Sequence, residues 1–207
     1  MRAVNLAILI AASFWVVAGP AVAADRSAAS VVKVSGAVRI NGRPAQVGAV
    51  VRQGDRVETE TSDQSYVDVR FSIDRVLRLK SGKMTLTRLT DQVVIGLDLG
   101  KTFVQAGPMT GRQTFRIHTP SAVAGVRGTK FFLATGAAET YICVCEGKVW
   151  AKKRGLMATA AKEMVVSAGE DAHIRPKEKL SAPVESPMMV KMTWDEFADM
   201  GFPKSEK

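Results

Sequence analysis

The sequence predicts an all-β protein of short antiparallel strands, with one short helix near the C-terminus. Apolar and polar residues alternate with period two through most of the chain, as in residues 66–73 (YVDVRFSI). Turn-forming residues separate these runs at intervals of about ten residues, and helix-period patterns are rare. Short strands with one solvent-facing side at this spacing predict a β-sandwich or a β-solenoid.

The first 23 residues have the order of a secretory signal peptide. Arg2 supplies a positive charge, residues 3–17 are almost all apolar, and Ala21-Val22-Ala23 forms an A-x-A cleavage site after Gly19-Pro20. We therefore expect cleavage near Ala23 and a mature protein in the periplasm or outside the cell. The alternative is an uncleaved anchor, but the apolar run is shorter than the ~20 residues that span a bilayer. No later segment is apolar for long enough, so we expect no transmembrane segment in the mature chain.

After a lead of residues 24–30, the β domain is expected over residues 31–175. The opening strand pair flanks Ser35-Gly36, and further strands are expected at residues 67–73, 77–80 and 84–87. Glycine, asparagine and aspartate mark the turns between strands. The predicted turns are Asn41-Gly42, Gly54-Asp55, Ser62-Asp63, Ser81-Gly82, Gly100, Gly107-Pro108, Gly111, Gly136, Gly147 and Gly169.

Two segments depart from the strand pattern. Residues 156–164 (LMATAAKEM) have a helix-friendly composition, and a long β-connection is the alternative. Residues 176–207 form a linker and an amphipathic tail, in which 192–200 is expected to be helical. Thr193 and Glu196 have the spacing of a capping box there. Trp194 and Phe197 fall near one face of this helix and are candidate partner-docking residues.

An approximate internal repeat links the two ends of the β domain. Gly36-Ala37-Val38 is followed by the segment 50–55 (VVRQGD), and Gly147-Lys148-Val149 is followed by 165–170 (VVSAGE). Two similar β-units that stack or pair would explain this pattern. Chance similarity is the alternative, because glycine and valine are common in the chain.

Cys143 and Cys145 are two residues apart on a predicted strand, so their side chains share a face. Their Cβ atoms would be roughly 6–7 Å apart, whereas an unstrained disulfide needs ~3.8 Å. Three interpretations of the two cysteines remain. They are two buried thiols, a distorted or intermolecular disulfide, or a metal pair. Because their neighbours Ile142 and Val144 are also apolar, the strand is expected to be central and covered on both faces.

No residue pattern predicts catalysis, a cofactor or a metal site. His118 and His173 have no metal-ligand spacing, and the chain has no G-x-S-x-G elbow or phosphate loop. Acidic residues are dispersed along strands and turns, which argues against a calcium loop. Trp150 and Trp194 are expected to be packing residues, with sugar platforms as the alternative.

The formal charge of +9 is spread along the strands. The largest basic cluster is Lys152-Lys153-Arg154, and nucleic acid is not an expected partner of an exported chain. An anionic envelope surface is the partner class that this charge allows.

The most informative segment is residues 119–131 (TPSAVAGVRGTKF). Thr119-Pro120 ends a strand, and small residues then permit close backbone approach. Arg127 lies between apolar neighbours beside Gly128, and its donors need acceptors. We expect them to bond turn carbonyls, with an anion site as the alternative.

This segment resembles the hallmark of the FecR family, TP-x-A-x-x-x-[VI]-RGT-x-F. The resemblance extends from Gly36 and 54–59 (GDRVET) at one end to 146–149 (EGKV) and 166–170 (VSAGE) at the other, over about residues 31–175. The residues that carry the motif are Thr119, Pro120, Arg127, Gly128, Thr129, Phe131, Glu146, Gly147 and Gly169.

The resemblance implies an all-β extracytoplasmic module without catalytic residues or cofactors. In regulators of this family the module follows a cytoplasmic anti-sigma region and one transmembrane helix, and it receives a signal from an outer-membrane transporter. Here we expect an export signal in place of the cytoplasmic region, and a tail shorter than the receptor-docking subdomain.

We therefore expect a non-enzymatic, exported interaction or signalling module whose partner is another envelope protein. The alternatives are a binder of anionic envelope polymers and a hydrolase with an unrecognised site.

Overall fold

The computed structural model describes residues 28–62, 64–154 and 163–202. The predicted signal peptide with Ala23, and most of the ambiguous segment 156–164, lie outside these residues. Within the described ranges, no helix combines the length and the apolar composition that a membrane crossing requires.

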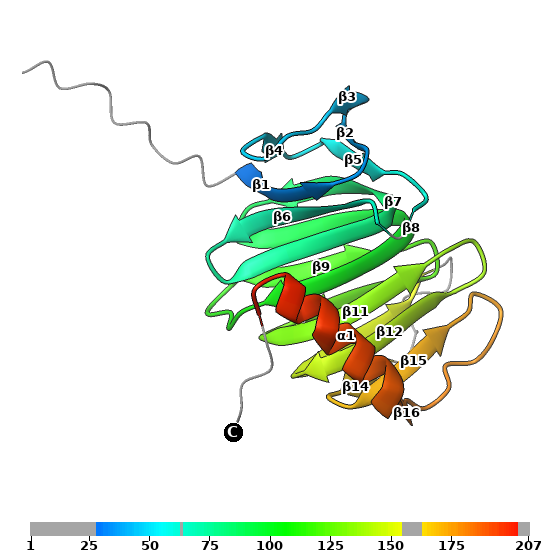
Figure 1. Cartoon of the computed structure of the whole chain (residues 1–207). Helices are drawn as coiled ribbons and strands as arrows, with labels where there is room; N and C mark the ends of the chain where they lie inside the picture. The colour runs from blue at the N-terminus through cyan, green and yellow to red at the C-terminus, as the bar shows by residue number, and fades with distance from the viewer. Residues whose placement is uncertain (1–27, 63, 155–162, 203–207) are drawn as a thin grey trace, which may run out of the picture.

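The described chain is all-β with one C-terminal helix, as the sequence predicts, and its strands join into a single sheet of sixteen (Figure 1). The strands are β1 (Ala28–Ser35), β2 (Val38–Ile40), β3 (Arg43–Pro44), β4 (Val50–Arg52), β5 (Arg56–Thr59), β6 (Tyr66–Ser72), β7 (Arg75–Leu89), β8 (Gln92–Ala106), β9 (Thr114–His118), β10 (Ala122–Val126), β11 (Thr129–Thr135), β12 (Thr140–Glu146), β13 (Lys148–Lys153), β14 (Met164–Ser167), β15 (Glu170–Ile174) and β16 (Val184–Glu185). The helix is α1 (Pro187–Asp199).

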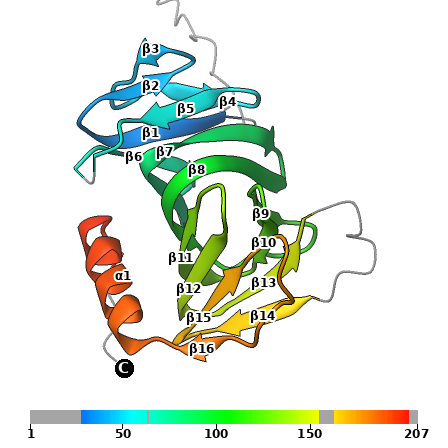
Figure 2. The same ribbon diagram turned by 90° about the vertical axis from the view of Figure 1, so that its right-hand side faces the viewer.

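The sheet folds over on itself into two facing layers (Figure 2). The first layer contains β2, β5, the second half of β7, the first half of β8, and then β9, β10, β13 and β14. The second contains β1, β6, the first half of β7, the second half of β8, and then β11, β12 and β15. All pairings are antiparallel except that of β8 with β9. The architecture is therefore closer to the predicted sandwich than to a solenoid.

The long strands β7 and β8 carry the chain from one layer to the other. The sequence predicts turns at Ser81-Gly82 and at Gly100, but β7 and β8 continue through both sites as bulges. A Cβ atom on Gly82 would lie 2.2 Å from the carbonyl oxygen of Leu99, and Gly100 has φ +118°. The glycines therefore permit a sharp bend of the paired strands, so the expectation of short strands is wrong here.

The apolar side chains between the two layers form the main core. Period-two alternation sends Leu77 and Leu79 of β7 into it, and Phe131 and Leu133 of β11, two strands away in the same layer, point to the same side. The residues that alternate with these point to the outer face of each layer.

The predicted internal repeat has a structural counterpart. Gly54 and Gly169 both have positive φ, +92° and +91°, in the turns β4–β5 and β14–β15. The acidic residue after each glycine accepts a backbone hydrogen bond at 2.7 Å, Asp55 from Arg52 N and Glu170 from Ser167 N. The two segments therefore form the same turn, stabilised in the same way.

Candidate functional site

The helix α1 lies against the outer face of the second layer and crosses its strands (Figure 1). It begins six residues before the position of the predicted capping box, with Pro187 in its first turn. Thr193 is therefore inside the helix, and its hydroxyl donates to the carbonyl oxygen of Met189 at 2.7 Å. The capping-box prediction is wrong, because proline at the helix start sets the N-terminus instead.

The C-terminal end of α1 is closed by Gly201, which has φ +87°. The amide of Phe202 donates to the carbonyl of Phe197 at 2.8 Å, the long hydrogen bond of a Schellman motif. Glu196 and Asp199 lie close to this end, where the helix dipole disfavours negative charge, and the last turn contains no basic residue. Cations outside the helix must therefore compensate these carboxylates.

Those cations come from a row of outward-facing side chains that runs across the second layer beneath α1. Strand register aligns Lys33, Asp68, Arg78, Phe103, Phe132 and Cys143 from β1 to β12. We call these six residues the transverse row. One end of the row is charged, and its middle is aromatic.

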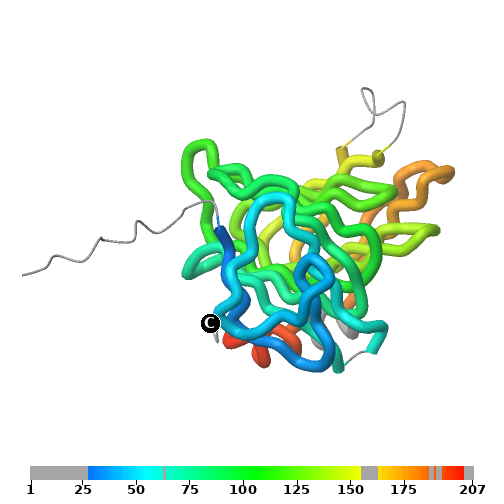
Figure 3. The backbone as a smooth tube through the Cα atoms, turned by 90° about the horizontal axis from the view of Figure 1, so that it is seen from above, coloured from blue at the N-terminus to red at the C-terminus, as the bar shows by residue number. Residues whose placement is uncertain are grey.

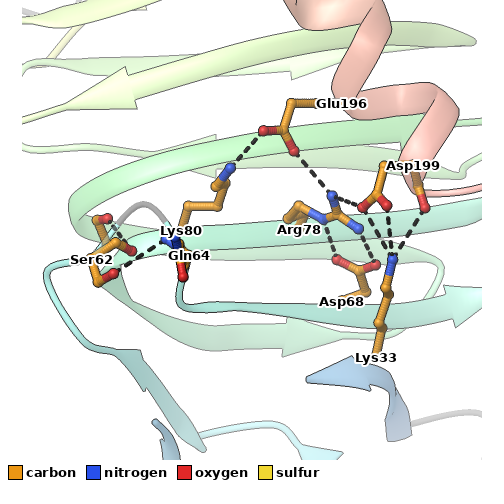
Figure 4. Close-up of polar contacts among 9 residues, drawn as sticks. Lys33, Ser62, Gln64, Asp68, Arg78, Lys80, Glu196 and Asp199 are labelled. Atoms are coloured by element: carbon orange, nitrogen blue, oxygen red, sulfur yellow. Dashed lines mark hydrogen bonds and ion pairs between the residues drawn. The ribbon is translucent and has the colours of Figure 1, made fainter. Parts of the chain in front are cut away.

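Arg78 is the centre of the charged end (Figure 4). Its Nε and Nη2 donate to both carboxylate oxygens of Asp68, at 2.7 and 2.8 Å, and both side chains are buried, 1% and 4% exposed. Its Nη1 donates to Asp199 at 2.6 Å and to Glu196 at 3.0 Å. One arginine thus connects the sheet to the last turns of the helix.

Two lysines complete this cluster. Lys33 lies 3.1 Å from the carboxylate of Asp199, and Lys80 lies 2.5 Å from that of Glu196. The Arg78 guanidinium also stacks on the Tyr66 ring, 4.1 Å from its centroid. Burial alone would lower the pKa of Arg78, but hydrogen bonds and attraction from Asp68, Asp199 and Glu196 outweigh it and raise that pKa.

The apolar part of the helix packs on the aromatic middle of the row. Phe197 is fully buried and meets Phe103 edge-to-face, with 6.3 Å between the ring centroids. Cys143 and Cys145 lie in the same cluster, whereas Ile142 and Val144 belong to the main core. The prediction that both cysteines share one face of a strand covered on both sides is confirmed. Both are buried thiols, and burial raises their pKa to about 11 and about 12, respectively.

A pocket of about 400 Å³ opens between α1 and the sheet. Phe103 and Phe132 supply its apolar wall, and Lys80 and Glu196 its charged rim. Trp194 is partly exposed on the helix, and the Lys130 ammonium lies 4.8 Å from its ring centroid.

From above, α1 (red) lies on one side of the strands, close to the N-terminal part of the chain (blue) (Figure 3).

Protonation of Asp199 should weaken the docking of α1. The hydrogen bonds from Arg78 and Lys33, and the charges of both, hold the pKa of Asp199 below its ordinary value. A carboxylate with a depressed pKa contributes stability above its unfolded pKa and loses it as the pH falls through the folded value. We therefore expect α1 to loosen below about pH 4.

Trp194 fluorescence, measured on residues 24–207 in a Trp150→Phe background, would report this change. The Asp199→Asn variant should show a weaker acid transition, whereas Asp195→Asn, which removes a neighbouring exposed carboxylate, should keep it. An acid transition of the same size in Asp199→Asn would contradict the assignment.

Most of the family-motif residues lie in or beside the turns β9–β10, β10–β11 and β12–β13. Thr119 and Ser121 hydrogen-bond the buried hydroxyl of Thr140, each at 2.6 Å. Pro120 is exposed beside them, and Phe131 is buried in the main core. Thr129 donates to the carbonyl of Lys148 at 3.0 Å.

The remaining motif residues join the β10–β11 and β12–β13 turns. Arg127 is exposed and donates to the carbonyl of Gly111 at 3.2 Å. A Cβ atom on Gly147 would lie 2.4 Å from the carbonyl oxygen of Gly128, and Gly147 has φ +81°. Glu146 pairs with Lys130 at 3.1 Å. These contacts are structural ones that fix the corner of the sheet, and Gly169 occupies the repeat turn described above.

The two histidines lie on different strands, β9 and β15. His173 is 3.2 Å from Glu139, and His118 is partly buried. Across residues 28–62, 64–154 and 163–202, His, Cys, Asp and Glu side chains do not gather in groups of three or more that could hold a metal ion.

Sequence reasoning missed the charged end of the transverse row. Arg78 and Asp68 alternate with buried leucines and valines, so the pattern predicts that they face solvent. Instead α1 covers Arg78 and Asp68. The one local signal was the acidic end of α1, which requires compensating cations from elsewhere.

Comparison with known proteins identifies one family. The family model described as FecR protein matches residues 50–150. None of the curated proteins matches the chain.

Two crystal structures of a candidate anti-sigma factor from Parabacteroides distasonis are similar to this chain. The first is 16% identical with a TM-score of 0.45, over 66% of this chain and 58% of that one. The second is 15% identical with a TM-score of 0.48, over 76% and 64%. The match therefore covers less than two thirds of the length of each of these two crystallised chains.

Proposed function

From the FecR domain that the chain carries over residues 50–150, we propose that the protein is a non-enzymatic, exported module that binds another envelope protein, in a signalling or regulatory role. The N-terminal sequence supports the location, because residues 1–23 have the order of a cleavable signal. The family supports the regulatory class.

The surface around α1 is the observation that carries this proposal. It combines a pocket of about 400 Å³ that the helix and the sheet share with partly exposed Trp194 elsewhere along the helix, whose ring centroid lies 4.8 Å from the Lys130 ammonium. An exposed tryptophan and an apolar pocket with a charged rim on one surface are the composition of a protein-docking surface. Because α1 forms one wall, a partner that binds here also senses whether the helix is docked.

Trp194 and Phe197, both predicted to dock a partner, have different places in this surface. Phe197 is fully buried against Phe103, so it holds α1 on the sheet and is not itself presented to a partner. Trp194 is the one of the two that is partly exposed. The proposal therefore assigns partner contact to Trp194 and helix docking to Phe197.

The chemistry of the buried polar residues supports a non-enzymatic role. Thr119, Ser121 and Thr140 are buried and satisfy one another's hydrogen bonds, so their hydroxyl groups are not poised as nucleophiles. The two thiols also have raised pKa values, the opposite of an activated cysteine.

Site-specific photo-crosslinking in cells tests the docking surface. Benzoylphenylalanine at position 194 should yield one discrete crosslinked protein partner. The matched control is benzoylphenylalanine at position 47, where Val47 is 64% exposed in the loop between β3 and β4. Equal products from both positions, or none from position 194, would contradict the proposal.

A further inference from the structure

The outer face of the first layer, on the other side of the main core, carries a second candidate surface. Strand register aligns Arg116 of β9, Gly125 of β10, Trp150 of β13 and Val165 of β14 in one row. The residues that alternate with them, such as Ile117 and Ala151, lie in the main core. This row therefore points outward.

Trp150 lies directly over the backbone of Gly125. A Cβ atom on Gly125 would be only 2.0 Å from the indole ring, so glycine is what allows the ring to rest on the strand. The ring stays partly exposed, and Val165 beside it is 48% exposed. The result is an aromatic surface supported by a rigid sheet.

Basic side chains surround this ring. The Arg116 guanidinium lies 5.8 Å and the Lys152 ammonium 6.0 Å from its centroid. His118 lies two residues from Arg116 on β9. Burial and the positive charges of Arg154 and Arg116 lower its pKa. Glu163 partly offsets the charge, since it pairs with Lys152 at 3.1 Å.

The basic character continues along the same layer. Arg127 and Lys148 are exposed at the ends of β10 and β13, where the register of these strands continues the outward face. The whole chain has an excess of nine positive charges. A cation-flanked tryptophan on the outer face of a sheet offers stacking and charge pairing together.

We propose that this face, centred on Trp150, Arg116 and Lys152, binds an acidic polysaccharide. A saccharide ring would stack on the indole, and carboxylate or sulfate groups on neighbouring sugars would pair with the flanking cations. The extended row of the sheet matches a linear chain of sugars better than a compact ligand. This surface is separate from α1, so the inference does not depend on the proposed protein partner.

Binding to polygalacturonate, measured with the purified mature chain, tests the proposal, with neutral dextran as the uncharged probe. Wild type should bind polygalacturonate and not dextran, and the affinity should fall steeply as salt rises. Arg116→Gln and Lys152→Gln should each weaken binding about tenfold, a loss of ~1.4 kcal/mol. Trp150→Ala should weaken it by a similar factor, and Trp150→Phe should restore most of the affinity.

Arg43→Gln is the matched control, because it removes one exposed positive charge from β3. Its affinity should stay within about twofold of wild type. The same loss in Arg43→Gln as in Arg116→Gln would overturn the site, since net charge alone would then explain binding. No binding to polygalacturonate would overturn it as well. Preferential binding to phosphatidylglycerol vesicles, with the same dependence on Trp150, would assign the face to a membrane and also reject the proposal.

Discussion

Replacement of Arg78 by methionine is expected to lower the free energy of unfolding by about 3–5 kcal/mol. The substitution leaves Asp68 buried without its bidentate partner, and it also releases Asp199 and Glu196 of α1. An uncompensated buried carboxylate is costly because the protein replaces none of the hydration that it lost. Urea unfolding of residues 24–207 would measure this difference.

The double variant Arg78→Met with Asp68→Leu separates the two contributions. Because both buried charges are then removed, most of the stability of the sheet should return, while α1 should remain loosely docked. Arg70→Met on β6 is the control, since Arg70 is exposed, and its effect should be within about 0.5 kcal/mol. A loss for Arg78→Met as small as that of Arg70→Met would contradict the role of the cluster.

The Phe197→Ala variant is expected to destabilise the docked helix by about 3–5 kcal/mol. Phe197 is fully buried and fills the space between α1, Phe103 and the two cysteines. Truncation leaves a cavity that the helix and the rigid sheet can close only in part. The loss should fall mainly on α1, because the main core between the layers does not contain this residue.

The reactivity of Cys143 and Cys145 reports this undocking directly. Burial under α1 keeps both thiols protonated and out of contact with reagents. If docking is weakened by 3 kcal/mol or more, labelling by a disulfide reagent should accelerate by about two orders of magnitude. Ala198→Ser, on the exposed side of the helix, should leave the rate near that of wild type. Unchanged labelling in Phe197→Ala would show that α1 does not protect the thiols.

These two variants also bear on the proposed partner surface. If a partner contacts Trp194 on the docked helix, Arg78→Met and Phe197→Ala should both reduce crosslinking from position 194. They should not affect binding of polygalacturonate at the Trp150 face, because a separate layer carries that face. The two proposed functions of the protein can therefore fail independently.

Much of the fold follows from local sequence patterns. Period-two alternation correctly separates core residues such as Leu77 and Leu79 from outward ones. The repeated Val-Val-x-x-Gly-acid segments do form matching turns, because Gly54 and Gly169 both adopt positive φ and the next carboxylate caps the turn. These outcomes were predictable because each depends on residues close together in the chain.

Other features depend on contacts between distant residues. The turns predicted at Ser81-Gly82 and Gly100 became a bend of paired strands, because each glycine lies against the other strand. The docking of α1 depends on Arg78 and Phe103, which are far from it in the chain, whereas its start at Pro187 is a local signal that the capping-box prediction passed over. Neither the mutual packing of two glycines nor the contact of a helix with a sheet has a local sequence pattern.

The sequence alone determined that the chain is all-β, which residues share a face of each strand, and which family motif the turns carry. Only the tertiary structure decided which outer face is covered. On the second layer, α1 buries Arg78 and Asp68, although their alternation is that of solvent-facing residues. On the first layer, Trp150 stays partly exposed among cations. The physical reason is that alternation assigns a side chain to a face, whereas its burial depends on what packs against that face from elsewhere in the chain.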